Sequence, residues 1–228
     1  MLGRDRNGGL EVLLLRRNKA LAFAGGFWVF PGGKVEPEEL TLGKDELDAA
    51  KLAAIRETKE ETNIDVDVEQ LLFFRHWTTP AIEPRRYATY FFFGEINTLM
   101  SEVTIDDSEI KEHIWLSPQA ALDKLTDRKM AMMPPTMMSL QLIKNCKSVK
   151  EVSALLSQEK PIFVLPVLQM EERKIICLYK GDAAYDSGNI SAVGARHRLI
   201  INKENGTINF EFRDCDEEIR PVNGGIQL

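Results

Sequence analysis

Apolar and polar residues follow two different periods along the first 160 residues of this 228-residue chain. Short apolar runs bounded by turn residues indicate strands, whereas apolar positions three or four residues apart indicate helices. Strands are expected at 10–15, 28–30, 66–75 and 86–96. Helices are expected at 119–125, 136–145 and 150–159, and a longer helix is expected between Asp45 and Asn63. This alternation predicts an α/β fold with helices on both faces of a sheet.

After residue 160 the pattern indicates strands alone, at 162–169, 174–179, 198–202 and 207–213. Asn205-Gly206 between the last two is a strong hairpin signal. We therefore expect a domain at 1–159 and a small β-rich extension at 160–228 that packs on it. The extension either caps a substrate cleft or forms a homodimer interface. Fewer than ten residues precede the first expected strand, so either the chain starts short or the domain is slightly trimmed.

The longest expected helix carries three glutamates on one side. At about 100° per residue, Glu57, Glu60 and Glu61 lie within roughly 100° of one another around the helix. Like charges three and four residues apart repel, so solubility alone gives little reason to group them. Mg²⁺ and Mn²⁺ prefer oxygen ligands, which makes these carboxylates a candidate metal site. The alternative is a solvated acidic face.

The ends and faces of this helix suit a metal site. Asp45 is the expected N-cap, and Asn63 is expected to end the helix in the left-handed conformation. The core face is expected to contain Leu47, Ala54 and Thr58, with Leu52 and Ile55 at its edge. The glutamate side is expected to contain Ala49, Ala50 and Ala53. These small residues leave room for the upstream Gly32-Gly33 loop to approach the glutamates.

Together these residues resemble the signature of the Nudix hydrolases, Gly-x5-Glu-x7-Arg-Glu-U-x-Glu-Glu-x-Gly-U, where U is aliphatic. The matching residues are Gly33, Glu39, Arg56, Glu57, Glu60, Glu61 and Ile64. Thr58 and Asn63 depart from the pattern, and sixteen residues separate Glu39 from Arg56 where the family has seven. The insertion is expected to move Glu39 relative to the helix and to weaken its role. The resemblance implies an α/β/α sandwich with a mixed sheet.

Further segments are similar to one branch of this family, the peroxisomal-type coenzyme A diphosphatases. They are 73–80, 85–92, 109–118, 134–136 and 195–199. The resemblance implies cleavage of the diphosphate in coenzyme A or acyl-coenzyme A. The alternatives are an ADP-sugar, dinucleotide or nucleoside triphosphate substrate, or a module that binds a nucleotide without cutting it. Such modules usually lack one signature glutamate, and all three are present here, so we expect an enzyme.

The same resemblance implies roles for individual residues. Mg²⁺ or Mn²⁺ bound by the three helix glutamates would neutralise the diphosphate and activate a water molecule. Arg56 is expected to hold a signature carboxylate in place, a task that suits a planar guanidinium. The general base is either a signature glutamate or Glu109, for which an exposed loop acid is an equally good interpretation. Glu95 is a weaker candidate.

Substrate contacts are expected from residues outside the helix. Arg85 and Arg86 could bind a diphosphate or a 3′-phosphate, although neighbouring strand residues point to opposite faces, so one of the two at most is expected at the site. The Gly32-Gly33 loop is expected to line the site. Trp77 is either a stacking platform for adenine or, as is more common, a core residue.

Composition limits the kinds of molecule that the protein is expected to bind. The net charge of −6 lacks the basic footprint of a nucleic-acid-binding protein, so a small nucleoside-diphosphate-linked molecule is the expected partner. Cys146, Cys177 and Cys215 lie far apart and form no CxxC pair, which favours a reducing, cytoplasmic location. The apolar run 10–15 is too short to cross a membrane.

Overall fold

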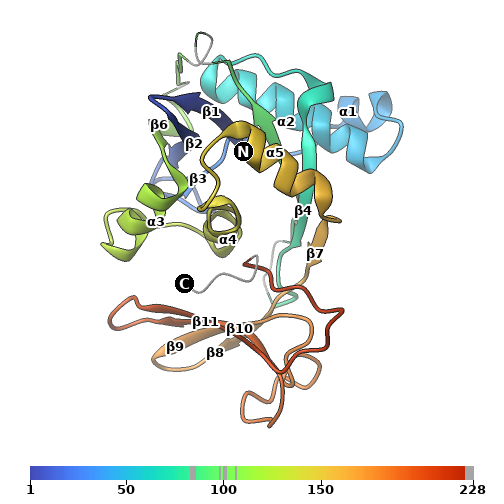
Figure 1. The fold of residues 1–228 in the computed structure, drawn as a ribbon, viewed down its shortest axis with the longest axis vertical. Coiled ribbons are helices and arrows are strands. Elements are labelled where there is room, and N and C mark those ends of the chain that lie inside the picture. Colours follow the sequence, from blue (N-terminus) through green and yellow to red (C-terminus); the bar gives the residue numbers. More distant parts are fainter. Residues whose placement is uncertain (83–85, 98, 100–101, 106, 224–228) are drawn as a thin grey trace. The chain divides into compact units, whose positions relative to one another are not determined.

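The apolar runs of the first half form one mixed sheet in the computed structural model, which describes residues 1–82, 86–97, 99, 102–105 and 107–223 (Figure 1). Its strands are β1 (Leu2–Arg6), β2 (Gly9–Arg17), β3 (Trp28–Val29), β4 (Leu72–Thr78), β5 (Ala88–Glu95) and β6 (Ile110–Leu116). The order is β3-β2-β1-β5-β4, and β6 pairs with β2. β1 is parallel to β5, whereas β2 is antiparallel to β1, β3 and β6. The expected mixed sheet is confirmed.

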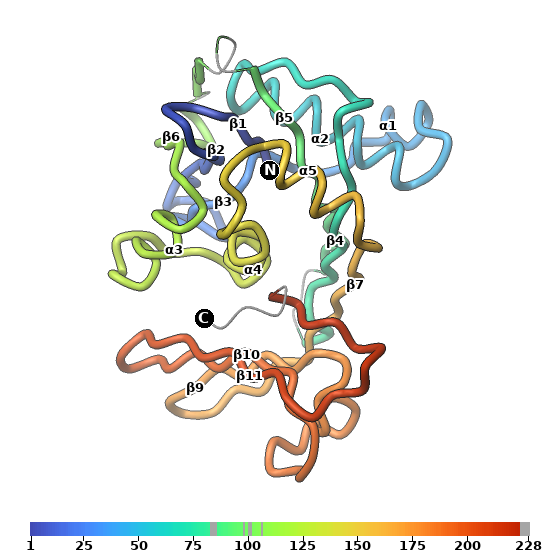
Figure 2. Tube along the Cα trace, viewed as in Figure 1, coloured from blue at the N-terminus to red at the C-terminus, as the bar shows by residue number. Residues whose placement is uncertain are grey.

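Strand β2 lies in the centre of the core. Its residues Val12 to Leu15 are fully buried, so their uninterrupted apolar run reflects burial on both faces of the sheet. Leu13 and Leu15 pack with Ile64, which follows the glutamate helix, and with Ile110 of β6. The sheet thereby joins segments far apart in the sequence, as Figure 2 shows for β1 beside β5.

Two strands of this sheet, β1 and β6, were not expected from the sequence. β1 was hidden because the buried Arg4 interrupts its apolar pattern. The Arg4 guanidinium bonds to Glu11 at 2.7 Å and lies 4.1 Å from the centre of the Trp115 ring, which compensates its burial. In β6 the exposed residues Lys111, Glu112 and His113 mask the strand.

The helices are α1 (Pro37–Leu42), α2 (Glu46–Thr62), α3 (Pro118–Thr126), α4 (Pro134–Ile143) and α5 (Val149–Gln158). The expected ends of α2 are confirmed, because Asp45 accepts a hydrogen bond from the Asp48 N–H at 2.8 Å and Asn63 has a φ of 59°. Ala50 differs from expectation, since it packs against Leu71 and Phe92 instead of lying on the glutamate side. The core side of α2 is therefore broader than expected.

The segment expected to be one strand at 66–75 divides into two elements. A single 3-10 turn, η1 (Val68–Gln70), comes first, because the Asp67 side chain accepts a hydrogen bond from the Glu69 N–H at 3.0 Å. Strand β4 then starts at Leu72. A local side-chain cap competes here with the extended backbone that the apolar residues favour.

The chain divides into two compact units, one of residues 1–74 and 90–160 and the other of residues 75–89 and 161–228. In the second unit, β7 (Ile162–Val164) pairs in parallel with the end of β4. A four-stranded antiparallel sheet follows, with the order β11-β10-β9-β8. Its strands are β8 (Val167–Met170), β9 (Lys174–Leu178), β10 (Arg196–Asn202) and β11 (Ile208–Arg213). The β-rich character expected of the C-terminal part is confirmed.

The second unit contains a buried ion pair, which joins Arg198 to Asp182 at 2.6 Å. The small sheet therefore contains a polar core.

Within the described part of the chain, every helix is too short or too polar to reach across a lipid bilayer.

Candidate active site

The last two turns of α2 present the three glutamates at different depths. Glu61 is buried, Glu57 is partly buried, and 58% of the Glu60 side chain is exposed. Their spacing along the helix puts them on adjoining positions of one side, as the sequence predicts. The three carboxylates therefore run from the protein interior to solvent.

The glycine loop meets this side of the helix. The Gly32 N–H donates a hydrogen bond to Oε2 of Glu61 at 2.9 Å, and the φ of Gly32 is 149°, which side chains rarely tolerate. A Cβ at Gly33 would overlap the carboxylate of Glu57. The close approach of this loop, expected from the glycine pair, is confirmed. Position 32 requires glycine because of its backbone conformation, and position 33 requires glycine because there is no space for a Cβ.

Arg56 is the centre of the hydrogen-bond network. Its Nη1 donates to Glu57 and to Glu60, each at 3.0 Å, and its Nη2 donates to the carbonyl of Lys34 at 2.8 Å. Its Nε donates to Oε1 of Glu39 at 2.7 Å. The hydrogen bond to Glu39 raises the pKa of Arg56 beyond its ordinary value, and the hydrogen bond to Glu57 and the charges of both carboxylates add to this, although partial burial opposes them. One guanidinium thus fixes two helix glutamates relative to Glu39 and to the glycine loop.

Glu39 contacts Arg56 on α2 despite the insertion that was expected to displace it, and its role in catalysis stays a prediction. Glu39 lies in α1, which Pro37 starts, and it accepts a hydrogen bond from the Glu36 N–H at 2.7 Å. The inserted residues after Glu39 form the end of α1, the link that follows and the start of α2. Burial by itself raises the pKa of Glu39, but hydrogen bonds from Arg56 and Glu36 outweigh it and lower the pKa. The sequence Glu-Pro-x-Glu, with proline at N1 and a glutamate at N3, was the available signal for this short helix.

These residues form an acidic site with one positive centre. The carboxylates of Glu39, Glu57 and Glu60 pair with the guanidinium of Arg56, and that of Glu61 accepts the Gly32 N–H. A hollow of about 510 Å³ lies beside them, lined by Glu36, Glu38, Glu39, Leu42, Arg56 and Glu60. The excess of hard oxygen donors suits Mg²⁺ or Mn²⁺ in charge and chemistry. Across the described ranges, however, no three acidic, histidine or cysteine side chains converge as a ready metal-binding group.

Two candidate bases, Glu109 and Glu95, lie outside the signature. Glu109 precedes β6 and pairs with Arg17 at 3.3 Å, and its carbonyl accepts a hydrogen bond from the Asn18 N–H at 2.7 Å. Its side chain is exposed, as the loop-acid interpretation also predicts. Glu95 is an exposed residue at the end of β5. Neither has Arg56 as its described partner.

Of the expected substrate-contacting residues, Arg86 and Trp77 belong to the second unit. Arg85 lies outside the described residues, and Arg86 is exposed. Trp77 is buried and packs edge-on against Tyr179, with ring centres 6.0 Å apart. This contact corresponds to the core-packing alternative for Trp77, not to an open stacking platform.

The chain is similar to known proteins. Residues 2–135 match the family model described as NUDIX domain. Nudix hydrolase 7 of Caenorhabditis elegans is 26% identical over 216 residues, which cover 78% of this chain and 71% of that protein. Nudix hydrolase 8 of Arabidopsis thaliana is 31% identical over 107 residues, which cover 46% of this chain and 26% of that protein.

Among solved structures, a NUDIX hydrolase from Alicyclobacillus acidocaldarius superposes with a TM-score of 0.60 at 20% identity. The superposition covers 68% of this chain and 93% of that one. At this identity the likeness concerns the fold alone. It agrees with the mixed sheet and flanking helices described above.

Proposed function

The chain belongs to the Nudix family and is a hydrolase of diphosphate bonds; from this premise we propose that it cleaves coenzyme A or an acyl-coenzyme A at the diphosphate. The main support for a catalytic site is the hydrogen-bond network centred on Arg56, which fixes Glu39, Glu57 and Glu60 beside the glycine loop. Side chains needed only for solubility would not require a shared guanidinium.

Nudix hydrolases depend in general on divalent metal ions. We propose Glu57, Glu60 and Glu61 as the residues that hold Mg²⁺ or Mn²⁺ here. When bound, the metal supplies positive charge to the diphosphate and lowers the pKa of a water molecule. The support is the acidic excess around Arg56 and the hard oxygen chemistry of its carboxylates.

The chain's own residues then have distinct tasks. Arg56 restrains Glu57 and Glu60 through its Nη1, so their oxygens need little reorganisation. The Gly32 N–H orients Glu61. A carboxylate accepts the proton of the attacking water, and the two candidates are a signature glutamate and Glu109. The exposed position of Glu109 leaves it accessible to a substrate, and Arg17 limits its mobility.

The choice of coenzyme A rests on the resemblance of segments 73–80, 85–92 and 109–118 to the coenzyme A diphosphatases. The reaction would yield adenosine 3′,5′-bisphosphate and 4′-phosphopantetheine or its acyl form. Water provides the oxygen that one product gains, and the bond broken is the phosphorus–oxygen bond of the diphosphate. We also propose a reducing, cytoplasmic location, which the wide spacing of the three cysteines favours.

The decisive experiment is a substrate panel with Mg²⁺ and, separately, Mn²⁺. Coenzyme A, acetyl-coenzyme A, ADP-ribose, NADH and dinucleoside polyphosphates are incubated with the protein in ¹⁸O-labelled water, and products are identified by mass. Preferred cleavage of the coenzyme A compounds, with one ¹⁸O in one product, supports the proposal. Preferred cleavage of another compound moves the assignment to that substrate. No cleavage of any compound favours a nucleotide-binding module.

A further inference from the structure

Asn18, which directly follows β2, holds the chain that leads into β6. Its side-chain Nδ2 donates to the carbonyl of Ser108 at 3.0 Å, and its backbone N–H donates to the carbonyl of Glu109 at 2.7 Å. Its Oδ1 accepts the Ala20 N–H at 3.1 Å. The short amide of asparagine therefore bonds in two directions, to its own turn and to a segment 90 positions further along the chain.

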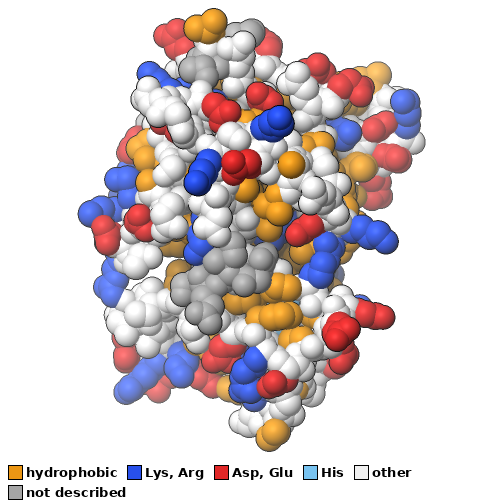
Figure 3. Space-filling view, viewed as in Figure 1, with side chains coloured by type: hydrophobic (Ala, Val, Ile, Leu, Met, Phe, Trp, Pro, Cys, Tyr) orange, Lys and Arg blue, Asp and Glu red, His pale blue; other side chains and the backbone are white. Residues whose placement is uncertain are grey.

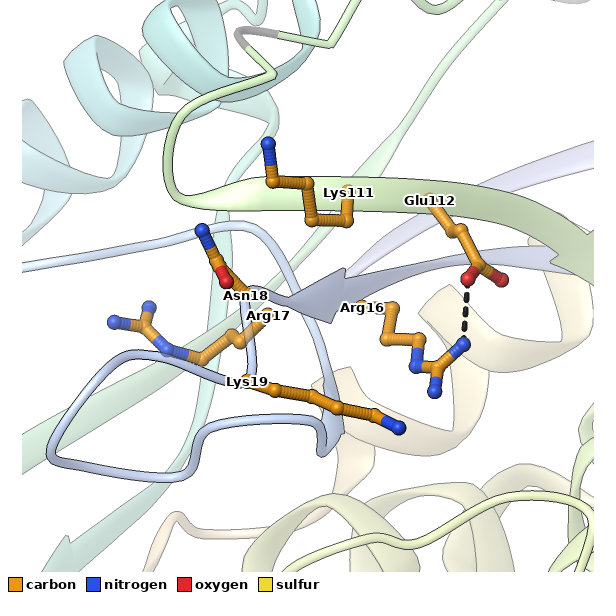
Figure 4. A pocket seen from close by; sticks show the side chains of 6 residues that line it. All are labelled: Arg16, Arg17, Asn18, Lys19, Lys111 and Glu112. Carbon is orange, nitrogen blue, oxygen red and sulfur yellow. Dashed lines mark hydrogen bonds and ion pairs between the residues drawn. The ribbon is translucent and has the colours of Figure 1, made fainter.

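A register shift brings Glu109 to this position. The ladder between β2 and β6 shifts by one residue near the end of β2. Beyond the shift Arg17 lies opposite Ile110, so Glu109 is the residue that meets Asn18. Such a shift bends a strand and changes which side chains lie together. Figure 4 shows that Asn18 points toward the chain that leads into β6, whereas Lys19 points away from it.

Residues on both sides of Glu109 contact the end of the glutamate helix. The Thr104 N–H donates to the carbonyl of Thr62, the last residue of α2, at 2.9 Å. Ile110 belongs to the same core cluster as Ile64, which follows that helix. Glu109 is therefore preceded and followed by contacts to the end of α2 that carries the signature glutamates.

The Glu109 carboxylate is restrained and still accessible. Arg17 pairs with it at 3.3 Å, and more than half of the side chain is exposed. Charge alone does not single out this residue, because acidic and basic side chains are interspersed on the face seen in Figure 3. The two hydrogen bonds from Asn18 to its segment distinguish Glu109 from an ordinary exposed acid.

We propose that Asn18 is the positioning residue of the general base and that this base is Glu109. The inference rests on the proposed function, which leaves the base open between Glu109 and a signature glutamate. In the step, the water oxygen bonds to phosphorus and its proton passes to the carboxylate, while the electron pair of the broken phosphorus–oxygen bond goes to the leaving phosphate. Because Asn18 bonds to the backbone beside the carboxylate, the base needs less reorganisation to meet the water.

Asn18→Asp isolates this contact. Aspartate has the same size and keeps the acceptor for the Ala20 N–H, but it has no donor for the Ser108 carbonyl. The turn is expected to survive, while the segment that carries the base is released. Asn189→Asp is the matched control, because Asn189 is an exposed residue of the second unit and accepts the Ser191 N–H at 3.1 Å in the same way.

A double-mutant cycle, measured with a substrate that the wild type cleaves, tests whether Asn18 acts through Glu109. Glu109→Gln is expected to lower kcat about a hundredfold. Asn18→Asp is expected to lower kcat about tenfold with KM unchanged, and the control to change neither. In the double variant, Asn18→Asp should have no effect beyond that of Glu109→Gln. Full activity of either single variant, or losses that multiply in the double variant, overturns the proposal.

Amide exchange in the full chain tests the contact without turnover. Residues 107–112 should exchange faster in Asn18→Asp than in the wild type and in Asn189→Asp. Equal exchange in all three proteins would show that Asn18 does not hold the segment. If the wild type cleaves no compound of the panel, the proposed function fails, and exchange alone decides whether Asn18 holds the segment. If it cleaves and the losses multiply, the assignment of Asn18 and Glu109 fails while the proposed function stands.

Discussion

Glu39 and Arg56 form an ion pair of 2.7 Å although they are 17 positions apart and belong to different helices. The Glu39 side chain is almost fully buried, with 8% exposed, and also accepts the N–H that begins its own helix. The pair therefore couples the fold of α1 to the geometry of Glu57 and Glu60 on α2.

Replacing Glu39 tests this coupling. In Glu39→Gln the negative partner of Arg56 is lost, so the free energy of unfolding is expected to fall by about 1–3 kcal/mol at pH 7. Arg56 then restrains Glu57 and Glu60 less well, and kcat is expected to fall about tenfold. Urea denaturation and steady-state kinetics measure the two effects. Glu69→Gln, at an exposed position in η1, is the matched control and should change neither.

The stability effect of Glu39 is also expected to depend on pH. Its pKa in the folded protein is lowered from the ordinary value of 4.5, so the carboxylate stabilises the fold fully above that value. The contribution disappears as pH falls through the lower folded pKa. Unfolding of the wild type and Glu39→Gln should therefore differ most near neutral pH and converge as the pH falls below 4.5. A difference that grows with acidification would contradict the ion-pair interpretation.

Removing the charge of Glu60 tests the metal site with little effect on folding. The side chain is largely exposed and its pair with Arg56 is worth only about 0.3–0.5 kcal/mol, so the thermal midpoint of Glu60→Gln should stay near that of the wild type. Turnover with Mg²⁺ is expected to fall about a hundredfold. Mn²⁺ binding, followed by electron paramagnetic resonance, should weaken in parallel. Unchanged turnover and unchanged Mn²⁺ affinity would remove Glu60 from the metal site.

Gly33 provides a steric test of the same site. In Gly33→Ala the new methyl group overlaps the Glu57 carboxylate, so this carboxylate must move away from Nη1 of Arg56. We expect kcat to fall at least about tenfold, because displaced charge is stabilised less well in the transition state. Gly9→Ala is the control, since nothing lies within 4 Å of a Cβ at that position. Equal activity of the two variants would show that the loop yields without disturbing Glu57.

The environment of His197 predicts that the second unit loses stability as the pH falls. The Val222 N–H donates to Nε2 of this buried histidine at 3.2 Å, and its Nδ1 lies 2.7 Å from the Lys180 carbonyl. Burial lowers the pKa of His197 from its ordinary value of 6.5, although the Lys180 carbonyl and the charge of Asp182 oppose this shift. The neutral ring therefore stabilises the fold above pH 6.5, and this contribution is lost as pH falls toward the lower folded pKa.

The measurement is the free energy of unfolding between pH 7.5 and 5.5 for the wild type and His197→Phe. Phe cannot titrate, so its variant should lose less stability on acidification than the wild type does. Amide exchange at Val222, corrected for the intrinsic effect of pH, should increase in the wild type over the same range. Parallel stability profiles of the two proteins would show that His197 does not contribute to the pH dependence.

Local chemistry made much of α2 predictable. Asp45 and Asn63 end the helix through bonds to residues three or four positions away, and Glu57, Glu60 and Glu61 share one side because of helix geometry alone. The glycine pair likewise predicted a close approach of the loop. These features depend on neighbours in the sequence, so the sequence contains what is needed to infer them.

The rest was decided by contacts between distant segments. Strand β1 exists because Glu11 and Trp115 accommodate the buried Arg4, and the register of β6 shifts where it meets the end of β2. The contact between Glu39 and Arg56 depends on how α1 folds back onto α2. The sequence by itself determined the family, the helix and its carboxylates. Only the tertiary structure decided which side chains meet across 17 or more positions, because burial and charge compensation there depend on the folded chain as a whole.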